Sequence, residues 1–282
     1  MSRYDEQIRV TVVLQDKLVA KAKKMFRKKT LFIYACGDMK MPSSHSSKPG
    51  TLLAAAAACV LLAASQASAT ETKEQYIAAG IFETGLLPEM PEDVNCPGIT
   101  SGFADRYNRS GTLRSEYSPW LSHAGVDWGL PEGTPIVAIA DGQVIARQAD
   151  APGSATGNQV IIRHQARPDD ISASYVHLSG FNVDANQEVE RGQVIGFVGK
   201  TGKGVTYPHL HLNVYGRALV RLGDRKLRYR YDFLQFLSGD MTPIDPVKKR
   251  NQKVKVSYID QFGKVHPPET KVIWPFICQV KG

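Results

Sequence analysis

The sequence contains no apolar run of the roughly 18 residues that a membrane-spanning helix requires, which argues against a polytopic membrane protein. It also lacks the compositional bias of disordered, collagen-like or coiled-coil chains, since 43% of its 282 residues are apolar and 22% are charged. Cysteine is scarce, with four residues, and no C-x-x-C pair or zinc-finger spacing of Cys and His occurs. What remains is the composition of a soluble globular protein with one large domain or two small ones.

The net charge of +8 lies almost entirely in the first quarter of the chain. Residues 1–69 hold 11 Lys and Arg against 4 Asp and Glu, whereas residues 70–282 hold 24 against 23. The positive charge is therefore no evidence for nucleic-acid binding, because it falls where targeting signals are found.

Residues 41–69 contain the three parts of a secretory signal in the usual order. Lys48 supplies positive charge, residues 51–64 form an apolar core, and residues 67–69 read Ala-Ser-Ala, a small-residue cleavage site. We therefore expect an exported protein, periplasmic or associated with the cell envelope, with no transmembrane segment after the signal is cleaved. The alternatives are a buried helix, an uncleaved anchor, or a lipoprotein built on Cys59.

Forty residues precede this signal and include a basic run at residues 21–29. Either residues 1–40 are an unusually long n-region, or the start codon was chosen too far upstream. We favour the second interpretation, because a start at Met39 or Met41 gives a signal of ordinary length.

Cleavage of the signal near Thr70 would remove Cys36 and Cys59 and leave Cys96 and Cys278. An even number of cysteines suits an oxidising compartment, in which the two can form a disulfide. Two buried free thiols are the alternative.

After the signal, the pattern predicts an N-terminal arm followed by a β-rich domain. The arm, residues 70–97, begins with a helix at residues 73–82 and ends in a Pro-containing stretch. From residue 98 to residue 216, short β-rich runs recur between turn signals, one of which is the hairpin signal Asp141-Gly142. The expected strands cover residues 135–140, 143–146, 159–164, 173–178, 193–198 and 210–215. We expect a mainly β domain with a mostly antiparallel sheet.

Residues 217–282 form a basic C-terminal extension. They carry 14 basic and 6 acidic side chains, whereas residues 70–216 carry 10 and 17. Arg and Lys alternate with aromatic residues between positions 225 and 231, as on some nucleic-acid surfaces. In an exported protein we instead expect contact with anionic envelope polymers or with the acidic domain, and a solvated strand face is the plain alternative.

Four histidines and one aspartate fall into three short patterns. These are His123-Ala-Gly-Val-Asp127, Tyr175-Val-His177 and His209-Leu-His211. Residues i and i+2 of a strand point to the same face, so His209 and His211 project together. Gly125 permits a tight turn that would bring its two flanking ligands to one ion. Two imidazoles and one carboxylate leave the fourth position of a tetrahedral zinc open for water, as catalytic sites require.

Each of these patterns is weak alone, but their joint occurrence in order favours a metal site.

Three other features receive structural interpretations. Gly199-Lys200-Thr201 is similar to the end of a phosphate loop, yet Val194 stands where the first glycine belongs, so we expect a hairpin turn. His164 and His266 fit no pattern, and we expect both to be structural.

The segments that carry these patterns resemble the catalytic domain of the lysostaphin-type, or M23, zinc metallopeptidases, which includes the LytM-like cell-wall hydrolases. The resemblance covers residues 101–215. Its motifs are Ser101-Gly-Phe-Ala-Asp-Arg106, His123-Ala-Gly-Val-Asp127, Gly133-Thr-Pro135, Asp141-Gly142, Gly157-Asn158, Tyr175-Val-His177-Leu178, Gly192-Gln-Val-Ile-Gly196 and His209-Leu-His211.

The resemblance implies that His123, Asp127 and His211 are ligands of Zn²⁺. It implies that His177 and His209 are the two non-ligand histidines beside the activated water, and that the substrate is a peptide bond in the stem or cross-bridge of peptidoglycan. One of the two would move the proton from the water to the leaving amine, and the other would donate a hydrogen bond to the developing oxyanion. Which of them takes which part stays open.

Three features depart from the family pattern or stay ambiguous. Tyr207 stands where the family usually has glycine before the H-x-H motif, and this bulk puts the substrate specificity in question. Tyr175 shares a strand face with His177, so it either lines the groove or packs in the core. The extension after residue 216 is longer than the usual end of the domain, and residues 242–246 resemble the family's terminal Asp-Pro segment.

These observations predict an exported zinc metalloendopeptidase that acts on peptidoglycan. One rival is a non-catalytic family member that binds the wall and activates another hydrolase, an envelope protein partner. The full set of ligands and histidines disfavours this rival. A lectin-like β module with a fortuitous histidine cluster is the second rival.

Overall fold

The computed structural model describes residues 71–115, 120–164, 170–237, 241, 243–245 and 251–281. The predicted signal at residues 41–69 and the forty residues before it lie outside the described part. Residues 242 and 246 of the predicted terminal Asp-Pro segment also lie outside it. Within the described part, no helix is long and apolar enough to cross a membrane.

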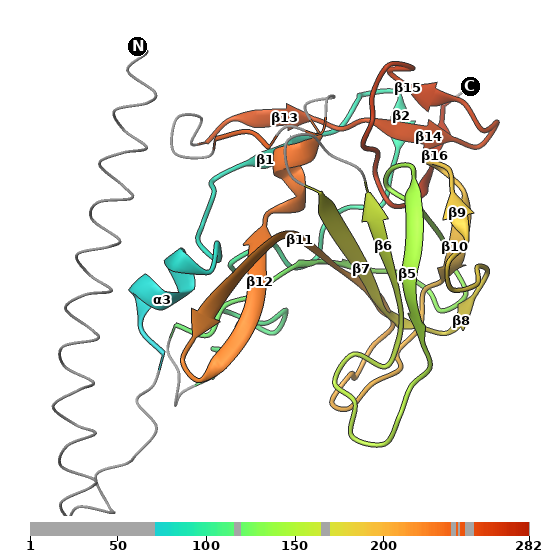
Figure 1. The fold of residues 1–282 in the computed structure, drawn as a ribbon. Helices are drawn as coiled ribbons and strands as arrows, with labels where there is room; N and C mark the ends of the chain where they lie inside the picture. Colours follow the sequence, from blue (N-terminus) through green and yellow to red (C-terminus); the bar gives the residue numbers. More distant parts are fainter. Residues whose placement is uncertain are drawn as a thin grey trace, which may run out of the picture. The chain divides into compact units, whose positions relative to one another are not determined.

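A large, mainly antiparallel sheet carries the site residues (Figure 1). Buried side chains alternate with more exposed ones at residues 160–164, as the period of two in an extended chain requires, whereas the four consecutive residues 173–176 are all buried. In spatial order the strands are β12 (Arg225–Tyr231), β11 (His209–Leu222), β7 (Ile171–Leu178), β6 (Asn158–His164), β5 (Gly142–Gln148) and β9 (Glu188–Val189), and β3 (Val126–Gly129) also pairs with β11. The mainly β, mostly antiparallel fold expected from the sequence is confirmed.

Three smaller sheets and two short helices complete the described part. One sheet joins β4 (Pro135–Val137), β10 (Val194–Phe197) and β8 (Gly180–Phe181), and another pairs β1 (Leu87–Glu89) with β13 (Lys253–Lys255). The third contains β15 (Val265–His266), β14 (Tyr258–Asp260), β16 (Ile277–Val280) and β2 (Val94–Asn95). The helices are α3 (Lys73–Ala78) and the 3-10 helix η1 (Phe233–Phe236).

Helix α3 is shorter than the helix expected at residues 73–82. It begins at a capping box in which the Thr72 hydroxyl accepts the Gln75 N–H and the Gln75 side chain accepts the Thr72 N–H. It ends before Gly80, whose φ of 82° lies in the left-handed region. A Cβ at this glycine would stand 2.2 Å from the carbonyl oxygen of Arg230, so the close approach of β12 also requires glycine there.

The residues after position 216 share the core of the β domain. Strand β11 runs through the expected boundary, from His209 to Leu222. Farther along, Trp274 and Phe276 pack edge-on against Trp128 of β3, with ring centroids 5.3 and 5.9 Å apart. All three of these side chains are buried. The C-terminal residues therefore support β3 from behind, which the charge pattern of the extension did not predict.

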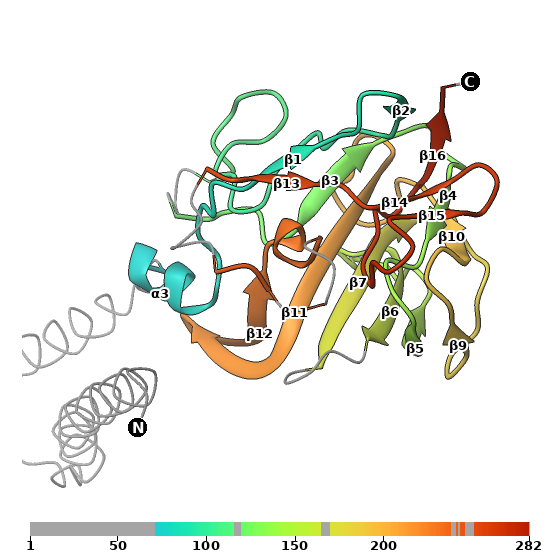
Figure 2. The ribbon, with the colours of Figure 1, turned by 90° about the horizontal axis from the view of Figure 1, so that it is seen from above.

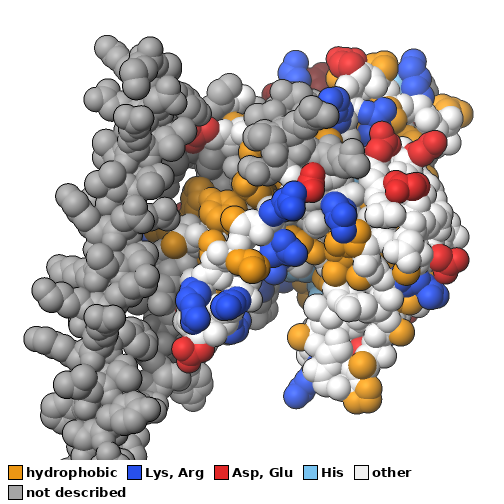
Figure 3. Space-filling model, viewed as in Figure 1, with side chains coloured by type: hydrophobic (Ala, Val, Ile, Leu, Met, Phe, Trp, Pro, Cys, Tyr) orange, Lys and Arg blue, Asp and Glu red, His pale blue; other side chains and the backbone are white. Residues whose placement is uncertain are grey.

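The basic stretch of the extension is the strand β12, which forms a hairpin with β11. Figure 3 shows Lys and Arg side chains gathered on this hairpin. Arg225 pairs with Glu71 at 3.0 Å, and the Arg230 guanidinium lies 5.1 Å from the ring centre of Tyr215. Arg225, Lys226 and Arg228 are exposed, so these side chains form the solvated strand face that was the plain alternative.

The N-terminal arm and the C-terminus are joined by a disulfide. Strand β2 pairs with β16, and the two lie side by side in Figure 2. This pairing brings together Cys96 and Cys278, which form a disulfide across a sequence separation of 182 residues. Of the two alternatives left open by the sequence, the structure has the bridge.

We predict that this disulfide stabilises the fold strongly. Closing a loop of 182 residues removes entropy from the unfolded chain, on the order of 5 kcal/mol in the chain-entropy model. Non-reducing digestion and mass spectrometry should yield a linked pair of peptides containing Cys96 and Cys278. The Cys96→Ser/Cys278→Ser variant should unfold at a clearly lower denaturant concentration, and equal midpoints would contradict the prediction.

Candidate metal centre

The pairing of β3 with β11 brings the side chains of Asp127 and His211 together across two strands. In the antiparallel register, Asp127 lies directly opposite His211, and Gly129 lies opposite His209. Side chains of directly opposed residues stand on the same face. On the other face, Trp128 of β3 and Leu210 of β11 are fully buried. Hydrophobic burial therefore fixes the face to which the polar residues point.

His123 reaches the same place from the loop before β3. The route requires Gly125, because a Cβ there would stand 2.5 Å from the carbonyl oxygen of Leu212 and 2.8 Å from the His211 ring. The sequence interpretation of Gly125 as a turn residue is corrected on this point. Its φ is not among the positive ones, so the reason for glycine is close packing.

The side chains of His123, Asp127 and His211, hereafter the metal centre, converge on one point. Nδ1 of His211 lies 2.7 Å from Oδ1 of Asp127, and Nε2 of His123 lies 3.1 Å from the same oxygen. The two ring nitrogens are 2.9 Å apart. Among the described residues, this is the group of His, Cys, Asp or Glu side chains that could hold a metal ion.

A hydrogen bond behind His123 leaves its Nε2 facing the carboxylate of Asp127. Nδ1 of His123 lies 2.8 Å from the carbonyl oxygen of Gly102, which only accepts hydrogen bonds, so Nδ1 carries the hydrogen. In the neutral ring, Nε2 then presents a lone pair to the carboxylate of Asp127, which is also an acceptor. A metal ion or an additional proton between these atoms would bridge the two acceptors, and Nδ1 of His211, 2.9 Å from this Nε2, is the other group within its reach. A backbone carbonyl that orients the far nitrogen of a histidine is the usual support of a metal ligand.

The balance of burial and hydrogen bonding lowers the pKa values of both Asp127 and His211. Burial raises the pKa of Asp127, but hydrogen bonds to His123 and His211 outweigh burial and hold the pKa well below its usual range. Burial lowers the pKa of His211, although the hydrogen bond to Asp127 opposes this effect. The carboxylate is therefore ionised, and the buried imidazole is neutral at neutral pH.

His177 is aimed at the metal centre by an irregularity in β7. Between the pairs Asn158–Leu178 and Val160–Tyr175, β7 has one more residue than β6, which is a β-bulge. At this bulge His177 has a φ of 67°, a left-handed conformation that costs a non-glycine residue about 1–3 kcal/mol. The bulge turns the ring toward His209, with ring centroids 4.7 Å apart. Asp127 on β3 and His177 on β7 therefore lie on the two strands that pair with β11.

His177 and His209 are oriented in the same way. Nδ1 of His177 donates to the carbonyl oxygen of Thr201 at 3.0 Å, and Nδ1 of His209 donates to that of Tyr207 at 2.9 Å. Burial, followed by the neighbouring histidines, lowers the pKa of His177 to about 4. With Nδ1 on a backbone carbonyl, Nε2 is the nitrogen of each ring that can exchange a proton or bind a substrate atom.

Tyr175 does not line the groove. Its ring is completely buried, and its hydroxyl accepts the N–H of Ile139 at 2.9 Å. The expectation that it shares a face with His177 was wrong, because the bulge between them breaks the alternation of the strand. Of the two alternatives for Tyr175, the structure has core packing.

The other features singled out in the sequence have structural contacts. His164 is buried and Nδ1 bonds the carbonyl oxygen of Asp141, while burial lowers its pKa to about 4. His266 bonds Asp260 at 2.8 Å. The Thr201 hydroxyl accepts the N–H of Asn158 and donates to the carbonyl of Leu178, so this residue fastens the loop that orients His177.

A cleft of about 610 Å³ opens beside the metal centre. Sequence reasoning missed three basic residues of its lining, Arg109, Arg114 and Lys203. Arg109 and Arg114 lie on the loop between Ser101 and His123, and Lys203 lies on the loop before Tyr207. No strand or helix periodicity marks these loops, so no signal in the sequence could have placed the three side chains together.

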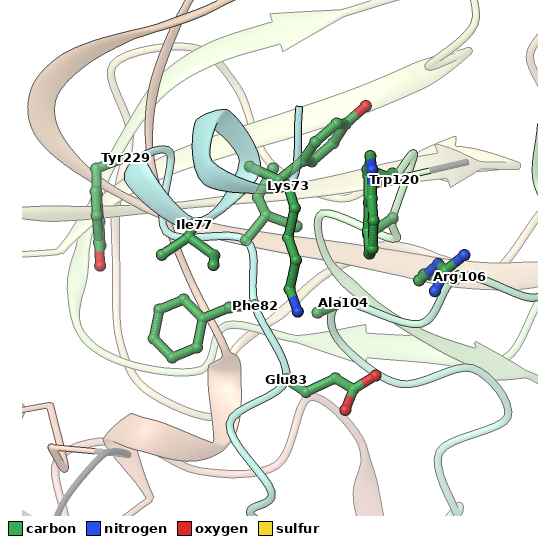
Figure 4. Close-up of a pocket in the computed structure, with 11 residues that line it drawn as sticks. Lys73, Ile77, Phe82, Glu83, Ala104, Arg106, Trp120 and Tyr229 are labelled. Atoms are coloured by element: carbon green, nitrogen blue, oxygen red, sulfur yellow. The ribbon is translucent and has the colours of Figure 1, made fainter. Parts of the chain in front are cut away.

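A second cavity, of about 590 Å³, lies against α3 and contains none of the histidines of the site. In Figure 4, Lys73 and Arg106 stand on either side of Trp120. Their cationic atoms are 5.4 and 4.7 Å from the centre of the indole ring. These cation–π contacts hold the indole of Trp120 between two positive charges.

Comparison with known proteins finds relatives of the segment that holds the site. Residues 121–221 match the model of peptidase family M23. The DD-carboxypeptidase/endopeptidase Mpg of Neisseria meningitidis is 46% identical over 92 residues, which are 33% of this chain and 20% of Mpg. The peptidoglycan DD-endopeptidase ShyB of Vibrio cholerae is 34% identical over 142 residues, which are 50% of this chain and 30% of ShyB.

Among solved structures, the catalytic domain of lysostaphin from Staphylococcus simulans is 27% identical, with a TM-score of 0.36. The similarity covers 49% of this chain and 88% of that domain. The chain spans only part of the curated relatives, a fifth of the length of Mpg and about a third of the length of ShyB.

The packing at Gly125 yields a test of the metal centre. We predict that Gly125→Ala displaces the His211 ring or the β11 backbone, because the added Cβ meets atoms at 2.5 and 2.8 Å. The variant should lose at least tenfold in metal affinity, measured as bound metal per chain after dialysis. Gly98→Ala is the matched control, since its Cβ would meet no atom within 4 Å. Equal metal content in the two variants would contradict the geometry described above.

Proposed function

We propose that this chain, whose residues 121–221 are a domain of peptidase family M23, is a zinc metalloendopeptidase that hydrolyses peptide bonds in peptidoglycan. The observation that carries the proposal is the convergence of His123, Asp127 and His211 beside two further histidines whose Nε2 atoms are free. The relatives Mpg and ShyB, whose names describe peptidoglycan peptidases, support the same substrate class.

The donor set fits zinc. Two imidazole nitrogens and one carboxylate oxygen are ligands that zinc accepts, and three protein ligands are the number found in catalytic sites, where one position stays open. The proximity of the Nε2 lone pair of His123 to the carboxylate of Asp127 supports a cation in this place. The bond from His123 to the Gly102 carbonyl, together with the packing of Gly125 against His211, would hold two of the ligands rigidly.

The residues around the metal centre supply the acid–base chemistry. Zinc, when bound, acts as a Lewis acid toward the water nucleophile and the scissile carbonyl. His177 and His209 each keep Nδ1–H on a backbone carbonyl, so Nε2 of one ring can take the proton of the attacking water and later deliver it to the leaving amine. Nε2 of the other ring, once protonated, can donate a hydrogen bond to the oxyanion that develops on the carbonyl oxygen.

The proposed place of action is the cell envelope. A peptidoglycan substrate lies outside the cytoplasm, and the signal predicted at residues 41–69 would deliver the chain there. The bridge between Cys96 and Cys278 agrees with an oxidising compartment. The proposal therefore includes a periplasmic or envelope-associated location, removal of residues 1–69, an N-terminal arm at residues 70–97 and a domain that begins near residue 98.

The test of the function is digestion of purified peptidoglycan with identification of the products. New amino and carboxyl termini should appear, a chelator should abolish their release, and added zinc should restore it. Binding to the wall without cleavage, in protein that contains zinc, would support the rival function of a regulator that activates another hydrolase.

We predict that His211 binds the metal, whereas His209 and His177 serve the acid–base chemistry. His211→Ala should lose both zinc and activity, whereas His209→Ala and His177→Ala should keep most of the zinc and lose activity on the order of 10²-fold or more, the usual size of a general acid–base contribution. The losses in the His177→Ala/His209→Ala double variant should be far from additive, because the two rings act on the same reaction step, one on the proton and the other on the oxyanion. Zinc content and the hydrolysis rate are measured on the same preparations.

His266→Ala is the control for this series, since it removes an imidazole outside the site. It should leave the zinc content and the rate of the folded protein unchanged. Zinc loss in His209→Ala comparable to that in His211→Ala would overturn the assignment of roles.

A further inference from the structure

The cleft beside the metal centre carries an excess of positive charge. Among its described lining residues, Arg109, Arg114 and Lys203 are basic and Asp127 is the only acid. Asp127 belongs to the metal centre, where the ring nitrogens already surround it. In the described part of the chain, none of the three basic side chains forms an ion pair with a carboxylate. We refer to these three residues and Tyr207 as the basic cleft.

Arg109 is presented to the cleft by Tyr207. Its guanidinium carbon lies 5.3 Å from the centre of the Tyr207 ring, and that ring lies 4.6 Å from the ring of His209. A guanidinium that stacks on an aromatic face keeps its in-plane N–H groups available for a second partner. Tyr207 stands where the family pattern has glycine, so this pair is a departure of the present chain.

Arg114 is held in place by neutral partners. Its Nε donates to the carbonyl oxygen of Asp105 at 3.0 Å, and its Nη2 donates to the Ser101 hydroxyl at 2.7 Å. These bonds orient the guanidinium without neutralising its charge. Burial raises the pKa of the Tyr207 phenol, and both Arg109 and Arg114 oppose this rise, which shows that the two cations act on the same part of the cleft.

We propose that the basic cleft binds a free carboxylate of the substrate next to the bond that is cleaved, and that Arg109 on Tyr207 is the main specificity determinant. The inference rests on the proposed function. A carboxylate matches the planar fork of a guanidinium and gains charge-assisted hydrogen bonds that an amide cannot replace. The enzyme therefore selects carboxylate-bearing peptides over neutral ones such as glycine chains, which leave the three cations without a partner.

The experiment compares two forms of one substrate. Purified peptidoglycan is used either with its native carboxylates or after their conversion to amides with carbodiimide and excess ammonium. The native chain should cleave the native wall at least tenfold faster, since one charge-assisted contact is worth about a factor of ten or more. Measurements in high salt remove diffuse attraction between charged surfaces.

The variants assign the effect to the cleft. Arg109→Gln should remove the preference, so that the variant cleaves the native wall and the amidated wall at equal rates. Lys226→Gln, which removes one charge from the exposed β12, is the matched control and should keep the tenfold preference. Equal losses in Arg109→Gln and Lys226→Gln would overturn the inference in favour of general charge attraction.

Failure of the inference is distinguishable from failure of the proposed function. Equal cleavage of both walls by the active native chain overturns the carboxylate subsite and leaves the peptidase function intact. Where no wall is cleaved, the proposed function fails. Co-sedimentation of the His209→Ala protein with each wall then decides the inference, since equal binding to native and amidated walls overturns it and preferential binding to the native wall supports it.

Discussion

The antiparallel pairing of β3 with β11 is the constraint on which the site depends. It sets Asp127 opposite His211 on one face and buries Trp128 and Leu210 on the other. A slip of one residue would turn Asp127 into the core and expose Trp128, which makes the register costly to change. The geometry of the metal centre thus follows from hydrophobic burial on the far side of the same two strands.

The C-terminal residues matter because they supply that far side. Trp274 and Phe276 pack on Trp128, and the Trp274 indole N–H donates to the carbonyl oxygen of Pro97 at 2.8 Å. The disulfide between Cys96 and Cys278 holds the arm and the tail at the same place. The arm and the extension thereby support β3, the strand that carries Asp127.

Backbone carbonyls determine what three of the four histidines can do. Gly102, Thr201 and Tyr207 each accept Nδ1–H from one ring, and all three belong to loops. In each case Nε2 is left to face the site, as a candidate ligand in His123 and as a candidate proton carrier in His177 and His209. The same kind of hydrogen bond therefore orients three histidines with different proposed roles. The distance of each ring from Asp127 distinguishes the candidate ligand from the candidate proton carriers.

The sequence alone determined the chemical types, the β class and most strands of the large sheet, because an alternation of two and an H-x-H pattern are local properties. It predicted His209 and His211 on one face for that reason. Tertiary structure decided those features of the site that arise from contacts between segments far apart in the sequence. The bulge that aims His177 and buries Tyr175 arises from the pairing of β7 with β6. The need for glycine at position 125 comes from β11, and the basic cleft combines loops separated by about ninety residues. These contacts leave no periodic trace in the chain, since packing between remote segments, rather than local propensity, holds them in place.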